Sequence, residues 1–129
     1  SLRCVDNLSS LREISDFAFA DCHSLSSIEL HKGLEVMGQW AFYNCESLKV
    51  LQIPSPIKKI QEYTFNGCKG LSRVSLPEQT QIIESHAFLG CESLKTIQIP
   101  PSVIEIGSNA FNGCKSLVSA ELSEGLKVL

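Results

Sequence analysis

Cysteines are the residues of this 129-residue chain with the widest range of possible chemistry, and there are six of them. Thiols form disulfides, ligate zinc and act as nucleophiles. Five recur at intervals of 23 residues, as Cys22, Cys45, Cys68, Cys91 and Cys114. Zinc sites use close pairs of ligands, and no row of histidines is present to complete a tetrahedron. We therefore expect no metal site.

The remaining polar residues do not form a catalytic pattern. His23, His31 and His86 occupy different positions relative to the cysteine spacing. Serines and acids are dispersed, without a nucleophile elbow, an inward pair of carboxylates or a glycine-rich phosphate loop. The chain is predicted not to be an enzyme.

Charge and hydropathy exclude two further classes of partner. The chain has 11 basic and 14 acidic residues, a net charge of −3, and its cations are not clustered. Nucleic acid and anionic membrane surfaces are therefore not indicated. No apolar run approaches the ~18 residues that span a bilayer, so we expect no direct membrane insertion.

The regular spacing itself is the main structural signal. Phenylalanines repeat with the cysteines, three residues earlier, as Phe19, Phe42, Phe65, Phe88 and Phe111. A fixed period of this length predicts a solenoid in which each coil contacts only its neighbours. We expect residues 1–129 to form one domain of about five repeats.

Two apolar rows separated by one polar residue predict a short strand in each coil. The first row is Ile28, Leu51, Val74, Ile97 and Ala120, and the second is Leu30, Ile53, Leu76, Ile99 and Leu122. Pro54, Pro77 and Pro100 follow and should end the strands, because proline cannot donate to a ladder. Successive strands are expected to stack in parallel.

Further inward rows should line the return side of each coil. One comprises Leu34, Ile57, Val103 and Leu126, with Thr80 as the exception, and the next comprises Ile14, Met37, Ile60, Ile83, Ile106 and Leu129. The phenylalanines should form a continuous aromatic row. Asp21, Asn44, Gly67, Gly90 and Gly113 tolerate positive φ, which predicts a tight turn before each cysteine.

This stacking bears on the cysteines. Neighbouring Cα atoms would lie ~5 Å apart, close enough for a disulfide. Side chains in register point the same way, however, and all five share a small apolar position beside the phenylalanines. We expect buried, reduced thiols that pack as small apolar groups. Cys4 lies outside the row and is expected to be an exposed thiol.

The segment from Leu94 to Leu117 resembles the BspA-like, or Treponema-type, leucine-rich repeat family. The resemblance is carried by the pattern L-x-x-I-x-L-P-x-x-V-x-x-I-G-x-x-A-F-x-x-C-x-S-L and covers essentially the whole chain, with Thr64 in place of the usual alanine. It implies a right-handed solenoid with a parallel concave sheet, with short strands or helical turns on the return side, and with no cofactor. It also implies a protein-binding, adhesive role at the cell surface or in secreted form.

Two surfaces are candidates for binding a protein partner. The concave sheet face should present Glu29, Gln52, Arg73, Ser75, Gln98 and Glu121. Solenoids use this extended surface for recognition. The alternative interpretation of the concave sheet face is a solvated surface that only keeps the protein soluble.

The second candidate is a stripe two residues before the phenylalanine row: Phe17, Trp40, Tyr63 and His86, followed by Asn109. Exposed aromatic residues are frequent at interfaces. Stacked rings also stabilise a fold locally, so both roles are open for this stripe.

The two ends of the chain and the cellular location of the protein each have more than one interpretation. Neither end has a polar capping repeat, which suggests a fragment of a longer array or end-to-end self-association. Reduced cysteines are equally compatible with the cytosol. We predict a protein-recognition module, with a structural spacer that presents another domain as the alternative. The sequence does not identify the partner.

Overall fold

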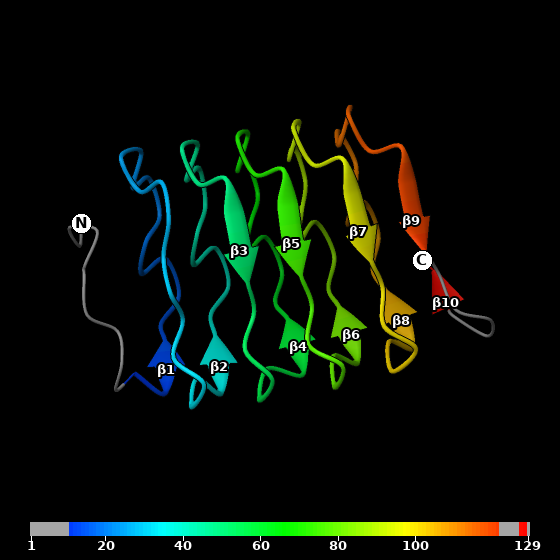
Figure 1. Cartoon of the computed structure of the whole chain (residues 1–129), viewed down its shortest axis with the longest axis horizontal. Coiled ribbons are helices and arrows are strands. Elements are labelled where there is room, and N and C mark those ends of the chain that lie inside the picture. The colour runs from blue at the N-terminus through cyan, green and yellow to red at the C-terminus, as the bar shows by residue number, and fades with distance from the viewer. Residues whose placement is uncertain (1–10, 122–126, 129) are drawn as a thin grey trace.

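The computed structural model describes residues 11–121 and 127–128 of the chain. The chain winds into successive coils that lie side by side along the long axis of the molecule (Figure 1). No α-helix occurs among the described residues, and the return side consists of short strands and turns. The predicted repeat solenoid with parallel strands is confirmed.

Three parallel sheets link the coils. The first contains β3 (Val50–Gln52), β5 (Arg73–Ser75), β7 (Thr96–Gln98) and β9 (Ser119–Glu121), in that order. The second contains β4 (Lys59–Ile60), β6 (Ile82–Ile83), β8 (Glu105–Ile106) and β10 (Lys127–Val128). On the same side as the second, β1 (Glu13–Ile14) pairs with β2 (Val36–Met37) (Figure 1).

The register of the first sheet follows the repeat. Leu51 lies opposite Val74, Val74 opposite Ile97, and Ile97 opposite Ala120. In β3, β5 and β7 the middle residue is buried and both flanking residues are exposed. The predicted alternation is correct, and it leaves two side chains per strand on the outer face.

One predicted strand is missing. The segment around Ile28 and Leu30 forms no strand, although both side chains are partly buried against the core. One backbone bond of this region is kept, since the Lys49 amide donates to the Ser26 carbonyl at 3.4 Å, the same length as the equivalent bond from Lys95 to Ser72 beside the β5–β7 ladder. The apolar residues are therefore in place, but a regular ladder to β3 does not form there.

The last described strand departs from the predicted register. The sequence places Leu129 beside Ile106, whereas the structure pairs Val128 with Ile106. Leu129 itself lies outside the described residues. A two-residue strand paired on one side specifies its register weakly, because few contacts oppose a slip.

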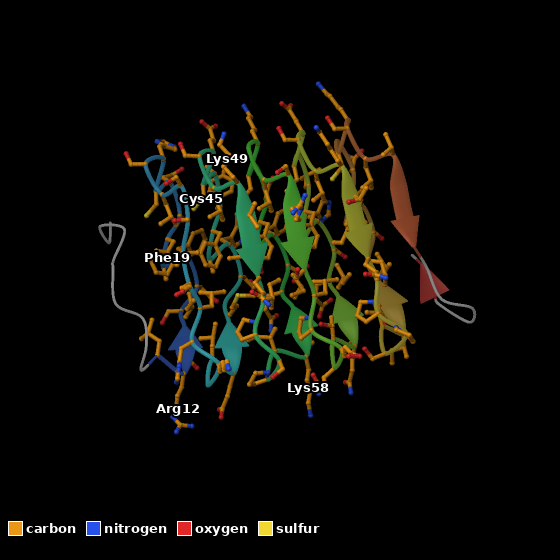
Figure 2. The ribbon with its side chains drawn as sticks, viewed as in Figure 1. Arg12, Phe19, Cys45, Lys49 and Lys58 are labelled. Atoms are coloured by element: carbon orange, nitrogen blue, oxygen red, sulfur yellow. The ribbon has the colours of Figure 1, made fainter. Side chains whose placement is uncertain are left out.

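The phenylalanine row forms the predicted aromatic column inside the solenoid. Neighbouring rings stack with centroids 5.2 to 5.4 Å apart. The backbone follows the same stacking, since the Phe42 amide donates to the Thr64 carbonyl at 2.9 Å and the Phe65 amide to the Ala87 carbonyl at 2.8 Å. Figure 2 shows Phe19 and Cys45 within the coils, while Arg12 and Lys58 extend away from the ribbon.

The cysteines pack beside this column and also bond to it. The Cys45 thiol donates to the Phe19 carbonyl of the preceding coil at 3.1 Å, and Cys68 donates to Phe42 at the same distance. Cys91 and Cys114 repeat the contact at 3.1 and 3.3 Å. The prediction of buried thiols is confirmed at Cys22, Cys45, Cys68 and Cys91. Cys114 is half-buried, and Cys4 lies outside the described residues.

Two threonines occupy positions that are apolar in the other coils. Thr64 and Thr80 are both fully buried. The Thr64 hydroxyl lies 2.9 Å from the Gln61 carbonyl and 3.2 Å from the Gly38 carbonyl. The Thr80 hydroxyl has no hydrogen-bond partner among the described residues. A buried hydroxyl without a partner destabilises the fold.

Thr80→Val should therefore stabilise the protein. The substitution removes the unpaired hydroxyl at nearly constant volume, and we expect the free energy of unfolding to rise by ~1 kcal/mol. Urea denaturation measures the change. Thr64→Val is the matched control and should lower stability, because its hydroxyl has acceptors. A loss of stability in both variants would contradict this interpretation.

Cys68→Ser should reduce the loss of stability at alkaline pH. Burial, and then the neighbouring Cys91 and Cys45 thiols, raise the pKa of Cys68 well above its ordinary value of 9.0. Burial likewise raises the pKa of Cys114 to about 11. Thiols of the unfolded chain ionise first, so this stabilisation is complete below the ordinary thiol pKa and declines as pH rises toward the folded-state pKa.

Serine keeps a hydroxyl donor and does not titrate in this range. The Cys68→Ser variant should therefore lose stability less steeply than the parent, by ~1.4 kcal/mol per pH unit above the ordinary thiol pKa. Urea denaturation at a series of pH values measures both slopes. Identical slopes would show that Cys68 is not held protonated by the fold.

Candidate recognition surface

The outer side of the first sheet, continued by residues 27–29, forms a surface that is polar except for Val50, and we call it the strand face. Its described residues are all exposed and are Ser27, Glu29, Val50, Gln52, Arg73, Ser75, Thr96 and Gln98. Five of the six predicted sheet-face residues are among them. The sixth, Glu121, lies in β9 opposite Gln98, and its side chain is outside the described part of the structure.

The strand-face side chains are not used by the fold. None of those described makes a side-chain hydrogen bond or an ion pair with another described residue. Charged residues elsewhere pair between neighbouring coils instead. Lys59 lies 3.3 Å from Glu84, and Arg12 lies 3.5 Å from Glu35. The polar groups of the strand face therefore remain available to a partner.

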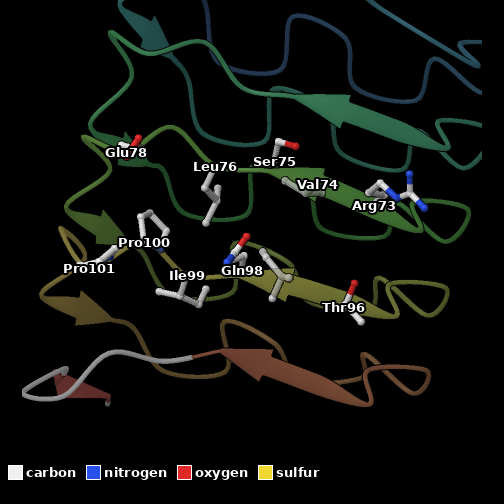
Figure 3. Close-up of a pocket in the computed structure, with 11 residues that line it drawn as sticks. Arg73, Val74, Ser75, Leu76, Glu78, Thr96, Gln98, Ile99, Pro100 and Pro101 are labelled. Carbon is white, nitrogen blue, oxygen red and sulfur yellow. The ribbon is translucent and has the colours of Figure 1, made fainter.

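A groove of about 610 Å³ crosses this face along β5 and β7. Its lining includes three of the predicted residues, Arg73, Ser75 and Gln98. Figure 3 shows Arg73 and Thr96 at one end of the groove and Glu78 and Pro101 at the other. Repeat periodicity does not reveal this hollow, because it depends on the space that neighbouring side chains leave.

The aromatic stripe forms a second column on the outside of the solenoid. Trp40 stacks on Tyr63 with ring centroids 4.1 Å apart, and Tyr63 stacks on the His86 ring at 4.7 Å. Phe17 lies 5.8 Å from Trp40, and Tyr43 meets Trp40 edge to face at 5.0 Å. Phe17 is 57% exposed, whereas Trp40, Tyr63 and His86 are half-buried.

The backbone of this column has an unusual conformation. All five residues of the row have positive φ, between 58° and 63°, as do Asp21 and Asn44 at the predicted turn position. The left-handed region costs a residue with a side chain roughly 1–2 kcal/mol. Asn109 is the one sequence signal for it, because asparagine tolerates this region and the aromatic residues rarely adopt it.

This geometry determines what the stripe offers to a partner. The two faces of the Trp40 ring lie against Phe17 and Tyr63, so the ring edges are what remain accessible. Stacking also offsets part of the backbone strain, since each aromatic pair contributes about 0.5–1.5 kcal/mol. A binding role for Phe17, Trp40, Tyr63 and His86 stays a prediction.

The cysteines and acids do not form a metal centre in the described part of the chain. Across residues 11–121 and 127–128, no group of three or more histidine, cysteine or acidic side chains is placed to hold an ion. The same residues include no helix long and apolar enough to cross a bilayer.

Family comparison agrees with the geometry. A model of BspA-type leucine-rich repeat regions matches residues 1–128, in six copies. The chain belongs to the BspA-type leucine-rich repeat family. The A-F-x-x-C pattern predicts about five repeats, whereas the family model counts six copies. The comparison with curated proteins gives no match.

Solved structures of leucine-rich repeat proteins share this fold. A leucine-rich cell surface protein from Faecalibacterium prausnitzii is 34% identical, with a TM-score of 0.86 over 92% of this chain. A leucine-rich repeat protein from Bacteroides ovatus is 36% identical and has a TM-score of 0.82 over 85%. The leucine-rich repeat protein of Treponema pallidum is 34% identical and has a TM-score of 0.83 over 85%. The chain spans 31%, 28% and 51% of these proteins, respectively.

Replacing Trp40 with asparagine should weaken this leucine-rich repeat array without changing its fold. Asparagine tolerates positive φ, as Asn109 shows in the same row, so the fold should persist and the measured loss is the lost ring contacts less the backbone strain that asparagine relieves. We expect the free energy of unfolding to fall by about 1 kcal/mol. Phe17→Asn removes one ring contact rather than three and should cost less. Equal losses from the two variants, measured by urea denaturation, would show that stacking does not stabilise the column.

Proposed function

We propose that this chain is a non-catalytic protein-recognition module that binds its partner on the strand face. The observation that supports this proposal is that the rows of equivalent residues have different structural roles. Inward rows build the core, and charged rows pair between coils. The strand face alone, among the rows described above, changes its side-chain chemistry from coil to coil while its described side chains make no hydrogen bond or ion pair with another described residue.

The size and chemistry of the surface suit a protein better than a small substrate. Its exposed groups include an acid, a cation, amides and hydroxyls spread over several coils, rather than converging on one reacting atom. Extended faces of repeat proteins bind partners in this way. The similarity to a protein described as a leucine-rich cell surface protein supports the same location for this chain.

An affinity capture experiment tests this proposal. The immobilised chain is incubated with an extract of surface proteins, and retained proteins are identified by mass spectrometry. The variant Arg73→Ala/Gln98→Ala removes two side chains of the groove. We expect one partner to be retained reproducibly by the parent chain, with its affinity reduced at least ~10-fold in the variant, which corresponds to ~1.4 kcal/mol.

Lys58→Ala provides the matched control, because Lys58 is exposed and extends away from the ribbon (Figure 2). It should retain the partner at the parent level. Equal retention by all three proteins would place the binding site elsewhere, with Trp40→Asn as the next variant to examine. Retention of no partner would support the alternative function, a structural spacer that presents another domain.

A further inference from the structure

The groove on the strand face has opposite charges at its two ends. Arg73 begins β5, and Glu78 lies in the turn after that strand. Both side chains are exposed, and neither forms an ion pair with a described residue. Each charge is therefore available to a bound molecule, and the two are far enough apart to act on different parts of it (Figure 3).

The middle of the groove carries no charge. Between its ends lie the polar side chains of Ser75 and Gln98, together with Leu76 and the buried residues Ile99 and Pro100. Hydroxyl and amide groups can bond to a peptide backbone, while the apolar surface favours uncharged side chains. The groove therefore has a positive charge at one end, no charge in the middle and a negative charge at the other end.

The distance between the two charged ends of the groove determines how long a bound peptide must be to reach both. Glu78 lies five positions after Arg73, so an extended chain places them on the order of 15 Å apart. A bound extended peptide has the same rise per residue and points alternate side chains to the same side. Side chains about four residues apart would therefore meet the two ends together.

We propose that the groove along β5 and β7 binds an extended segment of a partner protein that carries an acidic residue opposite Arg73 and a basic residue opposite Glu78. This proposal rests on the proposed recognition function and specifies its ligand. Carboxylates are the preferred partners of arginine because the guanidinium offers a planar pair of donors. A polyanion such as nucleic acid is disfavoured, since Glu78 and Glu29 lie on the same face and the chain has a net charge of −3.

Selection from a library of random peptides tests the proposal with the full chain. Peptides selected by the parent protein should be enriched in an acidic and a basic residue about four positions apart, separated by uncharged residues. Their binding should weaken as salt increases, because exposed charges are screened.

A charge swap provides the decisive comparison. The variant Arg73→Glu/Glu78→Arg retains the net charge and reverses the two ends of the groove. We expect this variant to lose at least ~10-fold in affinity for the parent's peptides. It should regain that affinity for versions of the peptides in which the acidic and basic residues are exchanged.

The swap Arg12→Glu/Glu35→Arg is the matched control. These two residues pair with each other at 3.5 Å and do not line the groove, so the exchange should leave peptide selection unchanged. Circular dichroism confirms that each variant is folded.

The outcomes separate this proposal from the proposed function. Peptides that are selected but indifferent to the Arg73 and Glu78 swap would overturn the charge pattern and leave recognition by the strand face intact. Selection of no peptide by a folded parent chain that still captures a protein partner would overturn the peptide-binding groove alone, and selection of no peptide together with capture of no partner would overturn both. Exchanged preference in the groove variant, with no exchange in the control, is the result that supports the inference.

Discussion

Equivalent residues of neighbouring coils must lie directly beside one another, and every other feature of this molecule depends on that constraint. A single coil is too narrow to enclose a core or to satisfy its own backbone. Phe42 illustrates the point, since its ring stacks on Phe65, its amide donates to the Thr64 carbonyl, and its own carbonyl accepts the Cys68 thiol. All three contacts are with the next coil, so each position must suit its copies on both sides.

This constraint divides the surface into rows with different freedom to vary. A residue inside the solenoid has to match the residues stacked against it, which explains why phenylalanine and cysteine recur without exception. The outer stripe is also constrained, because Trp40 and Tyr63 stack and share a left-handed backbone. On the strand face the side chains point away from the sheet, and backbone hydrogen bonds already hold its β-strands together. Arg73 and Thr96 can therefore be neighbours without any need to resemble each other.

Sequence alone predicted the features that the period imposes. The inward strand positions and the phenylalanine column are correct, because a mismatch in one coil would disturb both neighbours. Three features could not be predicted in this way. Trp40 and Tyr63 adopt a conformation that aromatic residues rarely take. The Thr80 hydroxyl lacks a partner, which only the packed structure reveals. The groove beside Arg73 depends on side-chain volumes, and the binding role of its residues remains a prediction that rests on exposure and charge.

The most direct test of the stacking constraint is the stability of two internal deletions. Removing residues 62–84 takes out one full period and joins Gln61 to Ser85, so every remaining row stays aligned. Removing residues 62–83 takes out one residue fewer and displaces all later coils from the rows before them. The account predicts cooperative urea unfolding and a native circular dichroism spectrum for the first deletion, and loss of cooperative unfolding for the second. Equal stability of the two proteins would contradict it.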